Sequence, residues 1–355
     1  MIDALEARNV DVTPVSAIGV LPLLSGCLRH GLPDVVHLHW LDNFFITERR
    51  FKSVLVTLLG IRLILEVIVL RALGVCTVWT IHNLSDHERH APRIEGVIRH
   101  VVARLMDRMI VHCARAAETV RTTYRLPERT ADRIRVVPHG NYDGMYTDEI
   151  TQSDARRTLD LATDSTVLLY FGQIRPYKNV PELIETFRTI EDERARLLIV
   201  GNPCDESMAA DVRRSSENDD RVRTVLEFVP DDDVHIYLNA ADAVVLPFER
   251  ILTSGSAVLA MTFGRGVIAP AIGCLPELVG DDGGILYDPT ARNALRSALS
   301  RAVADPRELE NMGNRNRLKA DQLEWDRIAA TTRDVFRYES DSTPPTPGKT
   351  GAETD

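Results

Sequence analysis

Four small residues, Thr253, Ser254, Gly255 and Ser256, lie between an apolar, strand-like run and the helix-forming run 257–263. A helix that begins there leaves several backbone N–H groups without intrahelical partners and points the positive end of its dipole outward. Such a helix start binds anions, and a pyrophosphate is a well-matched ligand. An ordinary strand, turn and helix with a small N-cap residue is the alternative interpretation of the same pattern.

Aromatic, histidine and acidic side chains follow the strand-like run 35–39, where the sequence reads HLHWLDNFF. His39, Trp40 and Asp42 lie there within four positions of one another. An aromatic ring presents an apolar face together with a polar group, and this combination suits a sugar or a lipid acceptor. We expect these three residues to bind an acceptor, and a structural role is the alternative.

A second polar group follows the strand-like run 75–81, in the segment IHNLSDHERH. His82 stands at the end of the strand, and Asp86 and Glu88 follow within the same loop. A neutral imidazole can hydrogen-bond a sugar hydroxyl or stabilise developing charge, and a carboxylate can act as a general base. These three residues are therefore the candidates for catalysis, and strand-end or solvated loop residues are the alternative.

The segments at 251–264, at 171–187 (FGQIRPYKNVPELIETF) and at 81–90 resemble the GT-B glycosyltransferases, specifically their group 1, family 4-like branch. The similarity extends over roughly residues 30–338 and is greatest at about 166–290. It implies an α/β fold of two Rossmann-like domains whose parallel sheets face a cleft. It also implies transfer of a sugar from a nucleoside-diphosphate donor to a glycan or lipid-linked acceptor.

The resemblance also implies roles for single residues. The family's phosphate-binding lysine corresponds to Lys178, and lysine is rare here, with four lysines against 38 arginines. The family's arginine position holds Gln173, and Arg175 substitutes for it two residues later. A solvated surface pair is the alternative for Arg175 and Lys178. The expected donor-binding residues are Gly172, Arg175, Lys178, Thr253, Ser254, Gly255, Ser256 and Glu277.

One departure from the family pattern concerns its two glutamates, which usually stand eight positions apart. The corresponding positions are Ile251 and Leu259, and neither side chain can accept a hydrogen bond from a sugar hydroxyl. The retaining stereochemistry usual in group 1 therefore does not carry over. An inverting reaction needs a base near the acceptor hydroxyl, and the sequence does not choose between Asp42, Asp86 and Glu88.

The elements that must position these residues alternate between short apolar runs and helical stretches. This pattern makes parallel sheets flanked by helices, in which ligands bind beyond the carboxyl ends of the strands. Strands are expected at 10–15, 35–39, 75–81, 108–112 and 135–138, and then at 166–171, 195–201, 223–228, 243–247 and 266–269.

We expect four segments along the chain. Residues 1–138 form an acceptor-side domain, 139–324 a nucleotide-sugar-binding domain, and 325–338 a helix that crosses back to the first domain. The tail 339–355 is rich in Ser, Thr, Pro and acids and is predicted to be disordered. The opening strand and glycine loop of the GT-B pattern are not found, so we expect either a start upstream of Met1 or a shortened first domain.

Composition limits the remaining function classes. The net charge of −10 argues against nonspecific nucleic-acid binding. Acid excess with few lysines suits a salt-rich cytoplasm, and codon bias in a GC-rich genome is the alternative. The five cysteines form no CxxC pair, which predicts neither a zinc site nor a disulfide framework and indicates a reducing, cytoplasmic location. Cationic side chains and the helix start can neutralise a leaving diphosphate, so no metal or other cofactor is expected.

The run 51–74 is almost continuously apolar, with Arg62, Glu66 and Arg71 recurring at helical spacing. A membrane-spanning helix carries few such charges, so a helix packed in the core is expected. Contact with a membrane or a lipid acceptor is the alternative. In that case the protein is peripheral on the inner face of the cell membrane.

A nucleotide-sugar-dependent hexosyltransferase is the predicted function. The missing glutamates keep a nucleotide-sugar epimerase, or a nucleotide-sugar-binding protein without catalysis, as alternatives. A serine hydrolase that uses Ser254 or Ser256 is a further alternative, but its nucleophile elbow needs G-x-S-x-G, and the segment reads T-S-G-S-A.

Overall fold

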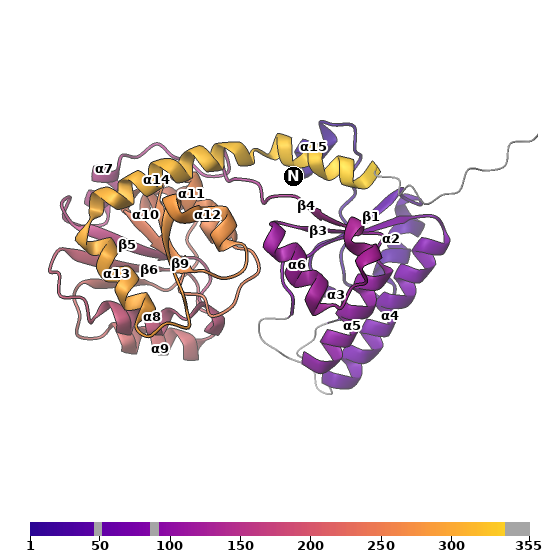
Figure 1. Ribbon diagram of the computed structural model, residues 1–355, viewed down its shortest axis with the longest axis horizontal. Coiled ribbons are helices and arrows are strands. Elements are labelled where there is room, and N and C mark those ends of the chain that lie inside the picture. Colours follow the sequence, from indigo (N-terminus) through magenta and orange to yellow (C-terminus); the bar gives the residue numbers. More distant parts are fainter. Residues whose placement is uncertain (46–51, 86–91, 338–355) are drawn as a thin grey trace, which may run out of the picture.

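The computed structural model describes residues 1–45, 52–85 and 92–337 of the chain. These residues contain two parallel β-sheets, one in each half, and helices flank both sheets. Figure 1 shows the halves side by side, with helices α14 (Pro306–Ala320) and α15 (Trp325–Arg337) along the upper edge of the view. The predicted α/β class with two Rossmann-like sheets is confirmed.

The first sheet has the strand order β1-β2-β3-β4, with every neighbouring pair parallel. Its central strands read as short apolar runs because a parallel sheet is covered on both faces. Its strands are β1 (Val35–Leu38), β2 (Cys76–Thr80), β3 (Arg108–Val111) and β4 (Ile134–Val136).

The second sheet has the order β10-β9-β8-β5-β6-β7, also parallel throughout. Its inner strands β8 and β9 are completely buried and form the centre of the larger hydrophobic core. The strands are β5 (Thr166–Phe171), β6 (Ala195–Val200), β7 (Val222–Val225), β8 (Ala243–Val245), β9 (Gly266–Pro270) and β10 (Gly284–Tyr287).

The helices follow the same division. Those of the first half are α1 (Ile2–Glu6), α2 (Pro22–His30), α3 (Asp42–Phe45), α4 (Lys52–Ala72), α5 (Pro92–Leu105) and α6 (Ala114–Thr123), with the 3-10 turn η1 (Glu128–Arg133). Those of the second half, before α14, are α7 (Gln152–Thr158), α8 (Val180–Phe187), α9 (Glu206–Ser216), α10 (Val234–Ala240), α11 (Gly255–Thr262), α12 (Leu275–Gly283) and α13 (Ala294–Ala304). The second half also contains the 3-10 turns η2 (Pro176–Lys178), η3 (Asp231–Asp233) and η4 (Asp321–Leu323).

The predicted strand at 10–15 is wrong, because this segment is irregular and joins neither sheet. Asn9, with φ of 60°, turns the chain at the end of α1. Pro14 has no N–H for a strand ladder, and Val15 is 46% exposed. The segment therefore offers neither a full set of hydrogen bonds nor a buried face. The other predicted strands are present, most of them with shorter ends.

Helix α4 has two apolar faces. Val56, Leu63, Val67 and Leu70 are fully buried in the core of the first half, close to β2 and α5. The stretch Ser53–Ala72 is long and apolar enough to cross a membrane, and 33% of it is buried inside the protein. The opposite face is exposed and is called the outer face of α4 below; it consists of Val54, Leu58, Ile61, Leu65, Ile68 and Val69, with Leu73 directly after the helix.

Arg62, Glu66 and Arg71 of α4 turn toward the protein and not toward the outer face of the helix. Glu66 is fully buried and accepts hydrogen bonds from the backbone N–H groups of Leu23 and Leu24 in the first turn of α2. Burial raises the pKa of Glu66. Arg62 and Arg71 donate to backbone carbonyls and pair with carboxylates of the protein. The helix therefore combines an inner face fixed by charge pairs with an outer face of aliphatic side chains.

Helix α15 lies on one face of the first sheet although it follows the second half in sequence. Its Ile328 and Val335 pack with Val78, Ile110 and Val137, which come from β2, β3 and the end of β4. Its hydrophobic residues recur at helical spacing, which gives it one apolar face. The tail at 339–355 lies outside the described residues.

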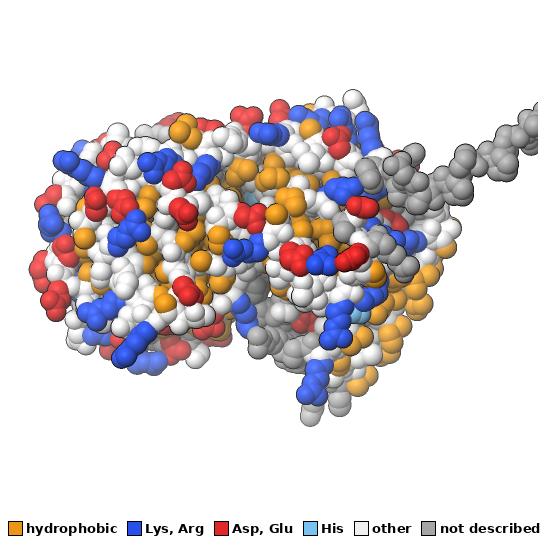
Figure 2. Space-filling model, in the orientation of Figure 1, with side chains coloured by type: hydrophobic (Ala, Val, Ile, Leu, Met, Phe, Trp, Pro, Cys, Tyr) orange, Lys and Arg blue, Asp and Glu red, His pale blue; other side chains and the backbone are white. Residues whose placement is uncertain are grey.

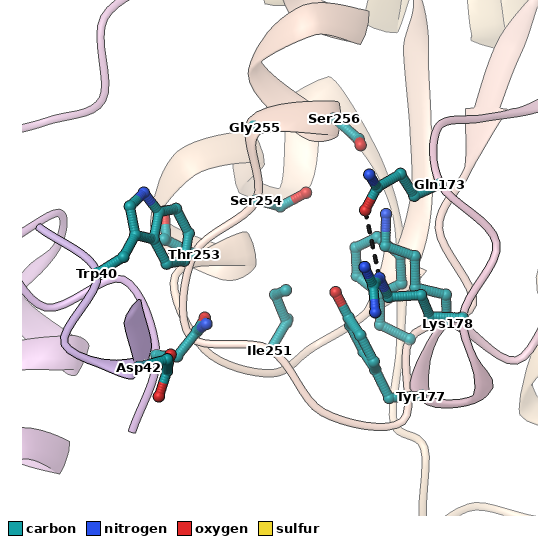
Figure 3. A pocket seen from close by; sticks show the side chains of 13 residues that line it. Trp40, Asp42, Gln173, Tyr177, Lys178, Ile251, Thr253, Ser254, Gly255 and Ser256 are labelled. Carbon is teal, nitrogen blue, oxygen red and sulfur yellow. Dashed lines mark hydrogen bonds between the residues drawn. The ribbon is translucent and has the colours of Figure 1, made fainter. Parts of the chain in front are cut away.

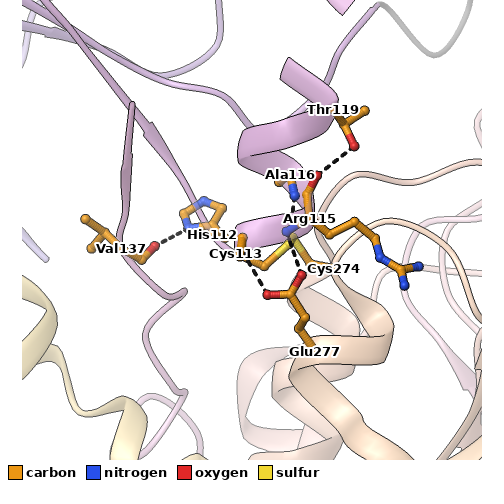
Figure 4. Close-up of a disulfide and its surroundings, with 9 residues drawn as sticks. His112, Cys113, Arg115, Ala116, Thr119, Val137, Cys274 and Glu277 are labelled. Carbon is orange, nitrogen blue, oxygen red and sulfur yellow. Dashed lines mark hydrogen bonds between the residues drawn. A yellow bond between two sulfur atoms is a disulfide. The ribbon is translucent and has the colours of Figure 1, made fainter. Parts of the chain in front are cut away.

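A disulfide joins the two halves, between Cys113 before α6 and Cys274 before α12 (Figure 4). The two Cα atoms are 5.7 Å apart although 161 positions separate them in sequence. The scattered cysteines predicted no such bond, and for this pair the prediction is wrong. Sequence spacing does not show which helix ends the two sheets bring together. The carboxylate of Glu277 reinforces the contact by accepting from the N–H groups of Ala114 and Arg115 at 2.8 and 2.6 Å.

Breaking this bond should destabilise the protein. A cross-link that closes so long a loop is worth about 2–5 kcal/mol, so reduction should lower the melting temperature. Cys113→Ser should melt at the temperature of the reduced protein, with or without reductant. Cys204→Ser, which removes an exposed free thiol, is the matched control and should melt like the wild type. Equal melting of the oxidised and reduced wild type would contradict the assignment.

Candidate active site in the interdomain cleft

A cleft of about 340 Å³ opens where the carboxyl ends of the two sheets approach each other. This is the edge at which open parallel sheets bind ligands. Figure 3 shows residues of the first half facing residues of the second across it. The cleft is lined by Trp40, Asp42, Asn83, Gln173, Arg175, Tyr177, Lys178, Phe248, Ile251, Thr253, Ser254, Gly255 and Ser256.

The start of α11 forms one end of the cleft's second-domain wall. Ser254 is the N-cap, and its Oγ accepts a hydrogen bond from the N–H of Ala257 at 3.1 Å. The first backbone N–H groups of a helix have no intrahelical partner, so this end is electropositive. Gly255 is needed for packing, because a Cβ there would lie 2.7 Å from the hydroxyl of Tyr142.

Lys178 provides the cation that stands beside this helix start. It ends the turn η2, and its Nζ lies 5.7 Å from the centroid of the Phe248 ring. Burial, together with repulsion from Arg175, lowers the pKa of Lys178 to about 8. The ammonium group is therefore charged at neutral pH but incompletely solvated, which favours a bound anion. Nε of Arg175 donates to Oε1 of Gln173 at 3.2 Å.

Gly172 adjoins the cleft and allows the turn after β5 to approach Lys178 and the start of α11. Its φ of +129° lies in a region that side chains other than glycine rarely adopt. A Cβ at this position would lie 3.4 Å from Oγ of Ser256 and 3.7 Å from Nζ of Lys178. The glycine turn after β5 and the start of α11 are therefore neighbours, although some 80 positions separate them in sequence.

Trp40, Asp42 and Asn83 form the first-domain wall, and histidines that do not line the cleft lie next to Trp40. The rings of Trp40 and His82 stack with centroids 4.4 Å apart and planes 15° apart. Nδ1 of His39 lies 3.1 Å from Nε2 of His82. Burial and the neighbouring histidines lower the pKa of His82 to about 2, so its imidazole is neutral at physiological pH. This wall offers hydrogen-bonding groups and an aromatic face without positive charge.

Asp42 also lines the cleft, but its carboxylate is bound within the first domain. Arg99, which is 2% exposed, forms an ion pair with Asp42 and a second one with Glu95 at 2.7 Å. A buried guanidinium needs such partners. Asp42 is therefore part of a structural ion-pair network as well as part of the cleft wall.

Known proteins resemble this chain in sequence and in fold. The model of the family "Glycosyl transferases group 1" matches residues 151–319. The GDP-mannose:glycolipid 4-beta-D-mannosyltransferase of Xanthomonas campestris pv. campestris is 30% identical over 281 residues, which are 77% of this chain and 73% of that protein. The chain belongs to the group 1 glycosyltransferases. It is an enzyme that transfers a sugar from a nucleotide-sugar donor to a glycan or lipid acceptor.

Solved structures show that the transferase has the GT-B fold. The sucrose-phosphate synthase of Thermosynechococcus elongatus superposes with a TM-score of 0.71 at 21% identity, over 89% of this chain and 76% of that one. The Anabaena protein HepE, solved with UDP and glucose, superposes with a TM-score of 0.70 at 17% identity, over 94% of this chain and 88% of that one. At such identities the likeness concerns the fold alone.

This transferase carries apolar side chains at the two positions where group 1 enzymes usually have glutamates. Ile251 lines the cleft, and Leu259 is buried inside α11 at 7% exposure. Glu249, a nearby carboxylate, is exposed and lines a separate depression with Asn179 and Glu182. Within the described residues, no glutamate lines the cleft of this transferase.

The predicted donor residues of the transferase fall into two places. Those of the glycine turn and of the α11 start surround the cleft. Glu277 does not line it; its carboxylate caps α6 across the domain interface. Asp86 and Glu88 lie outside the described residues.

Two aromatic cleft residues were not predicted from the sequence. Tyr177 precedes Lys178, and Phe248 follows the end of β8. Their rings are neighbours, with centroids 6.5 Å apart, and both are almost completely buried. The position of Tyr177 beside the lysine was the one available signal. Nothing in the sequence pairs Phe248 with it, because β5 and β8 are neighbours only in the folded sheet.

Lys178→Ala should weaken the binding of the donor's nucleoside diphosphate. It removes a charge-assisted contact worth about 1.5–3 kcal/mol, which corresponds to a roughly ten- to hundredfold higher dissociation constant. Because the pKa of Lys178 is about 8, affinity should be retained below that pH and fall as the pH rises through it. Isothermal titration between about pH 7 and pH 9 measures both effects.

Lys178→Arg is the matched variant for the pH effect. Arginine stays protonated throughout this range, so its affinity should not fall above about pH 8. Lys319→Ala, which removes a lysine of α14 outside the cleft lining, should bind like the wild type. A dissociation constant unchanged in Lys178→Ala would remove this residue from the donor site.

Proposed function

We propose that the transferase moves a mannosyl group from GDP-mannose to a hydroxyl group of a lipid-linked glycan. The observation that carries this proposal is the division of the cleft into two unlike walls. The second-domain wall offers Lys178, Arg175 and the start of α11 to a diphosphate. The first-domain wall offers the ring of Trp40 to sugars, and the neutral His82 stacks on that ring. The name of the Xanthomonas relative supplies the choice of GDP-mannose and of a glycolipid.

In this proposal the leaving GDP is stabilised by protein charges. The cations and helix dipole occupy the place at which charge develops as the bond to the phosphate breaks. They supply the positive charge that a divalent metal supplies in other sites, so we propose a metal-independent reaction. The residues assigned to this role are Gly172, Arg175, Lys178, Thr253, Ser254, Gly255 and Ser256.

The identity of the donor can be tested by thermal stabilisation. A ligand that binds the native state stabilises it by about 2.7 kcal/mol at a hundred times its dissociation constant. Among GDP, UDP, ADP and TDP, we expect GDP to raise the melting temperature most. GDP-mannose should then be consumed in the presence of a glycolipid acceptor at the same rate with and without EDTA. A larger rise in melting temperature with UDP would show that the donor is a UDP-sugar. No rise with any of the four nucleotides would refute the proposal.

We further propose that the enzyme works on the inner, cytoplasmic face of the cell membrane, with the outer face of α4 in the lipid. Isolated exposed apolar residues are common, but a contiguous stripe along one helix marks an interaction surface. Figure 2 shows hydrophobic side chains gathered at the right-hand edge of the molecule, over the region of α4. The net charge of −10 makes attraction to anionic lipids a weak contribution, so insertion of aliphatic side chains would dominate.

Charged substitutions on this face should release the enzyme from lipid. Leu58 and Leu65 are 59% and 55% exposed, and each buries apolar area worth up to about 1.5–3 kcal/mol in a bilayer. Leu58→Asp combined with Leu65→Asp should lower binding to phosphatidylethanolamine–phosphatidylglycerol vesicles at least about tenfold in a flotation assay. Its thermal shift with nucleotide should be unchanged, because the donor wall is in the second domain.

Phe228→Asp is the matched control. Phe228 is 73% exposed in the second half of the chain, so its substitution should not alter flotation. If the wild type did not float with vesicles, or if the α4 double variant floated equally well, the membrane proposal would fail. A second copy of the chain is the other possible occupant of this face. Light scattering of the wild type without lipid measures the molar mass and would then show a dimer.

A further inference from the structure

One histidine follows each strand of the first sheet: His39 after β1, His82 after β2, His112 after β3 and His139 after β4. Neighbouring strands lie about 4.8 Å apart, and the carboxyl ends of parallel strands meet at one edge. The ring centroids of successive histidines are accordingly 5.4, 5.2 and 5.6 Å apart. The sheet thus brings four distant residues into one row at the carboxyl ends of its strands.

The carbonyl oxygen of Val137 sets the direction of the hydrogen bonds in this row. It lies 2.8 Å from Nδ1 of His112 and can only accept, so Nδ1 of His112 carries a proton (Figure 4). Burial lowers the pKa of His112 to about 4, so the ring is neutral near pH 7 and its Nε2 is an acceptor. Nδ1 of His82, 3.4 Å from that Nε2, must therefore be the donor.

The tautomer of His82 in turn determines the hydrogen bond between His82 and His39. His82 is neutral, with its pKa lowered to about 2, and Nδ1 holds its one ring proton. Its Nε2 therefore accepts a hydrogen bond from Nδ1 of His39 at 3.1 Å. Burial lowers the pKa of His39 as well, which leaves Nε2 of His39 with an unprotonated lone pair. That nitrogen makes no hydrogen bond to any part of the chain that the structure describes.

His39 does not itself line the cleft, but it adjoins a residue that does. His39 is half-buried, and the next residue, Trp40, lines the cleft and stacks on His82. A sugar held against the indole face would therefore present its hydroxyl groups near His39. Asp42 is less suited to take a proton there, because its carboxylate already pairs with the buried Arg99.

We propose that His39 is the catalytic base of the transfer, and that His82 and His112 are positioning residues that hold it in the competent tautomer. This inference rests on the proposed function, since it assumes that an acceptor hydroxyl binds beside Trp40. It also implies inversion at the anomeric carbon, because a single displacement with a protein base is the inverting mechanism.

The step is balanced without any further reactant. The acceptor oxygen forms a bond to the anomeric carbon while the bond from that carbon to the phosphate oxygen breaks, and the electron pair leaves with the diphosphate. The hydroxyl proton moves to Nε2 of His39. His39 then carries the positive charge, and its Nδ1–H remains hydrogen-bonded to Nε2 of the neutral His82. The proton is returned to solvent after the products leave.

The tautomers themselves are the first test, and they do not depend on turnover. Long-range ¹H–¹⁵N correlation spectra of the ¹⁵N-labelled full-length protein near pH 7 distinguish Nδ1–H from Nε2–H histidines. His39, His82 and His112 should all be Nδ1–H. An Nε2–H tautomer or a protonated ring at any of the three would overturn the inference.

Turnover is the second test. His39→Gln should lower kcat by about 10²–10⁴, the usual contribution of a general base, with nucleotide affinity within about twofold. Added imidazole should restore part of the activity of His39→Gly, which a purely structural role does not predict. His37→Gln is the matched control: His37 shares the strand and touches His39 at 4.3 Å between ring centroids, but its Nε2 bonds Thr80. Equal losses in His37→Gln and His39→Gln, or a retained donor configuration in the product, would overturn the proposal.

The positioning role has its own pair of variants. The side-chain oxygen of His112→Gln can still accept from Nδ1 of His82, whereas His112→Leu cannot. The glutamine variant should keep most of kcat, and the leucine variant should lose about tenfold at unchanged KM. Equal kcat values in the two variants would overturn this role. A thermal shift with nucleotide shows that each variant is folded. If the wild type bound no nucleotide, the proposed function would fail while the measured tautomers could still hold.

Discussion

The two halves of the enzyme meet at a joint in which the backbone of Gly140 and Asn141 packs against the indole of Trp325. Nε1 of Trp325 donates to the carbonyl of Asn141 at 2.8 Å, and the backbone and side-chain N–H groups of Asn141 donate to the carbonyls of Leu323 and Ala320. A Cβ on Gly140 would lie 2.5 Å from the indole, so another residue would force the two apart. Because this joint fixes where α15 leaves the second half for the first sheet, the cleft and the interdomain disulfide depend on it.

Because the two sheets face each other, the cleft has a positively charged side and a side without positive charge. Burial lowers the pKa of Lys178 and of the histidines alike, but at neutral pH the lysine remains charged and the histidines are neutral. The ordinary pKa of lysine is far above 7, so a lowered pKa still leaves the side chain charged. The ordinary pKa of histidine is close to 7, so lowering it removes the charge. Burial therefore leaves a cation on the second-domain wall of the cleft and unprotonated ring nitrogens in the histidines next to the first-domain wall. Histidines that carried a positive charge could not accept a proton.

Helix α4 shows where a sequence pattern was ambiguous for a physical reason. Its length and hydropathy are equally compatible with a core helix and a lipid-contacting one. The folded chain shows that both faces are apolar and that Arg62, Glu66 and Arg71 make their contacts on the inner side. The charges that seemed to oppose a membrane role from sequence alone thus leave the outer face uninterrupted. Periodicity shows how the charged residues are spaced along the helix. Which side of the helix faces the core is decided by the sheet on which the helix packs.

The sequence by itself determined the α/β class, nearly all of the strands and most of the second-domain wall of the cleft, because a glycine turn and a capped helix start are local. Their chemistry follows from residues within a few positions, such as Arg175 with Lys178 or Ser254 with Gly255. Only the tertiary structure decided the pairing of Cys113 with Cys274, the capping role of Glu277 and the row that joins His39 to His112. These depend on contacts between segments far apart in sequence. Such contacts arise from the order of strands in a sheet and from the packing of one domain on the other, and neither leaves a periodic or local signal in the chain.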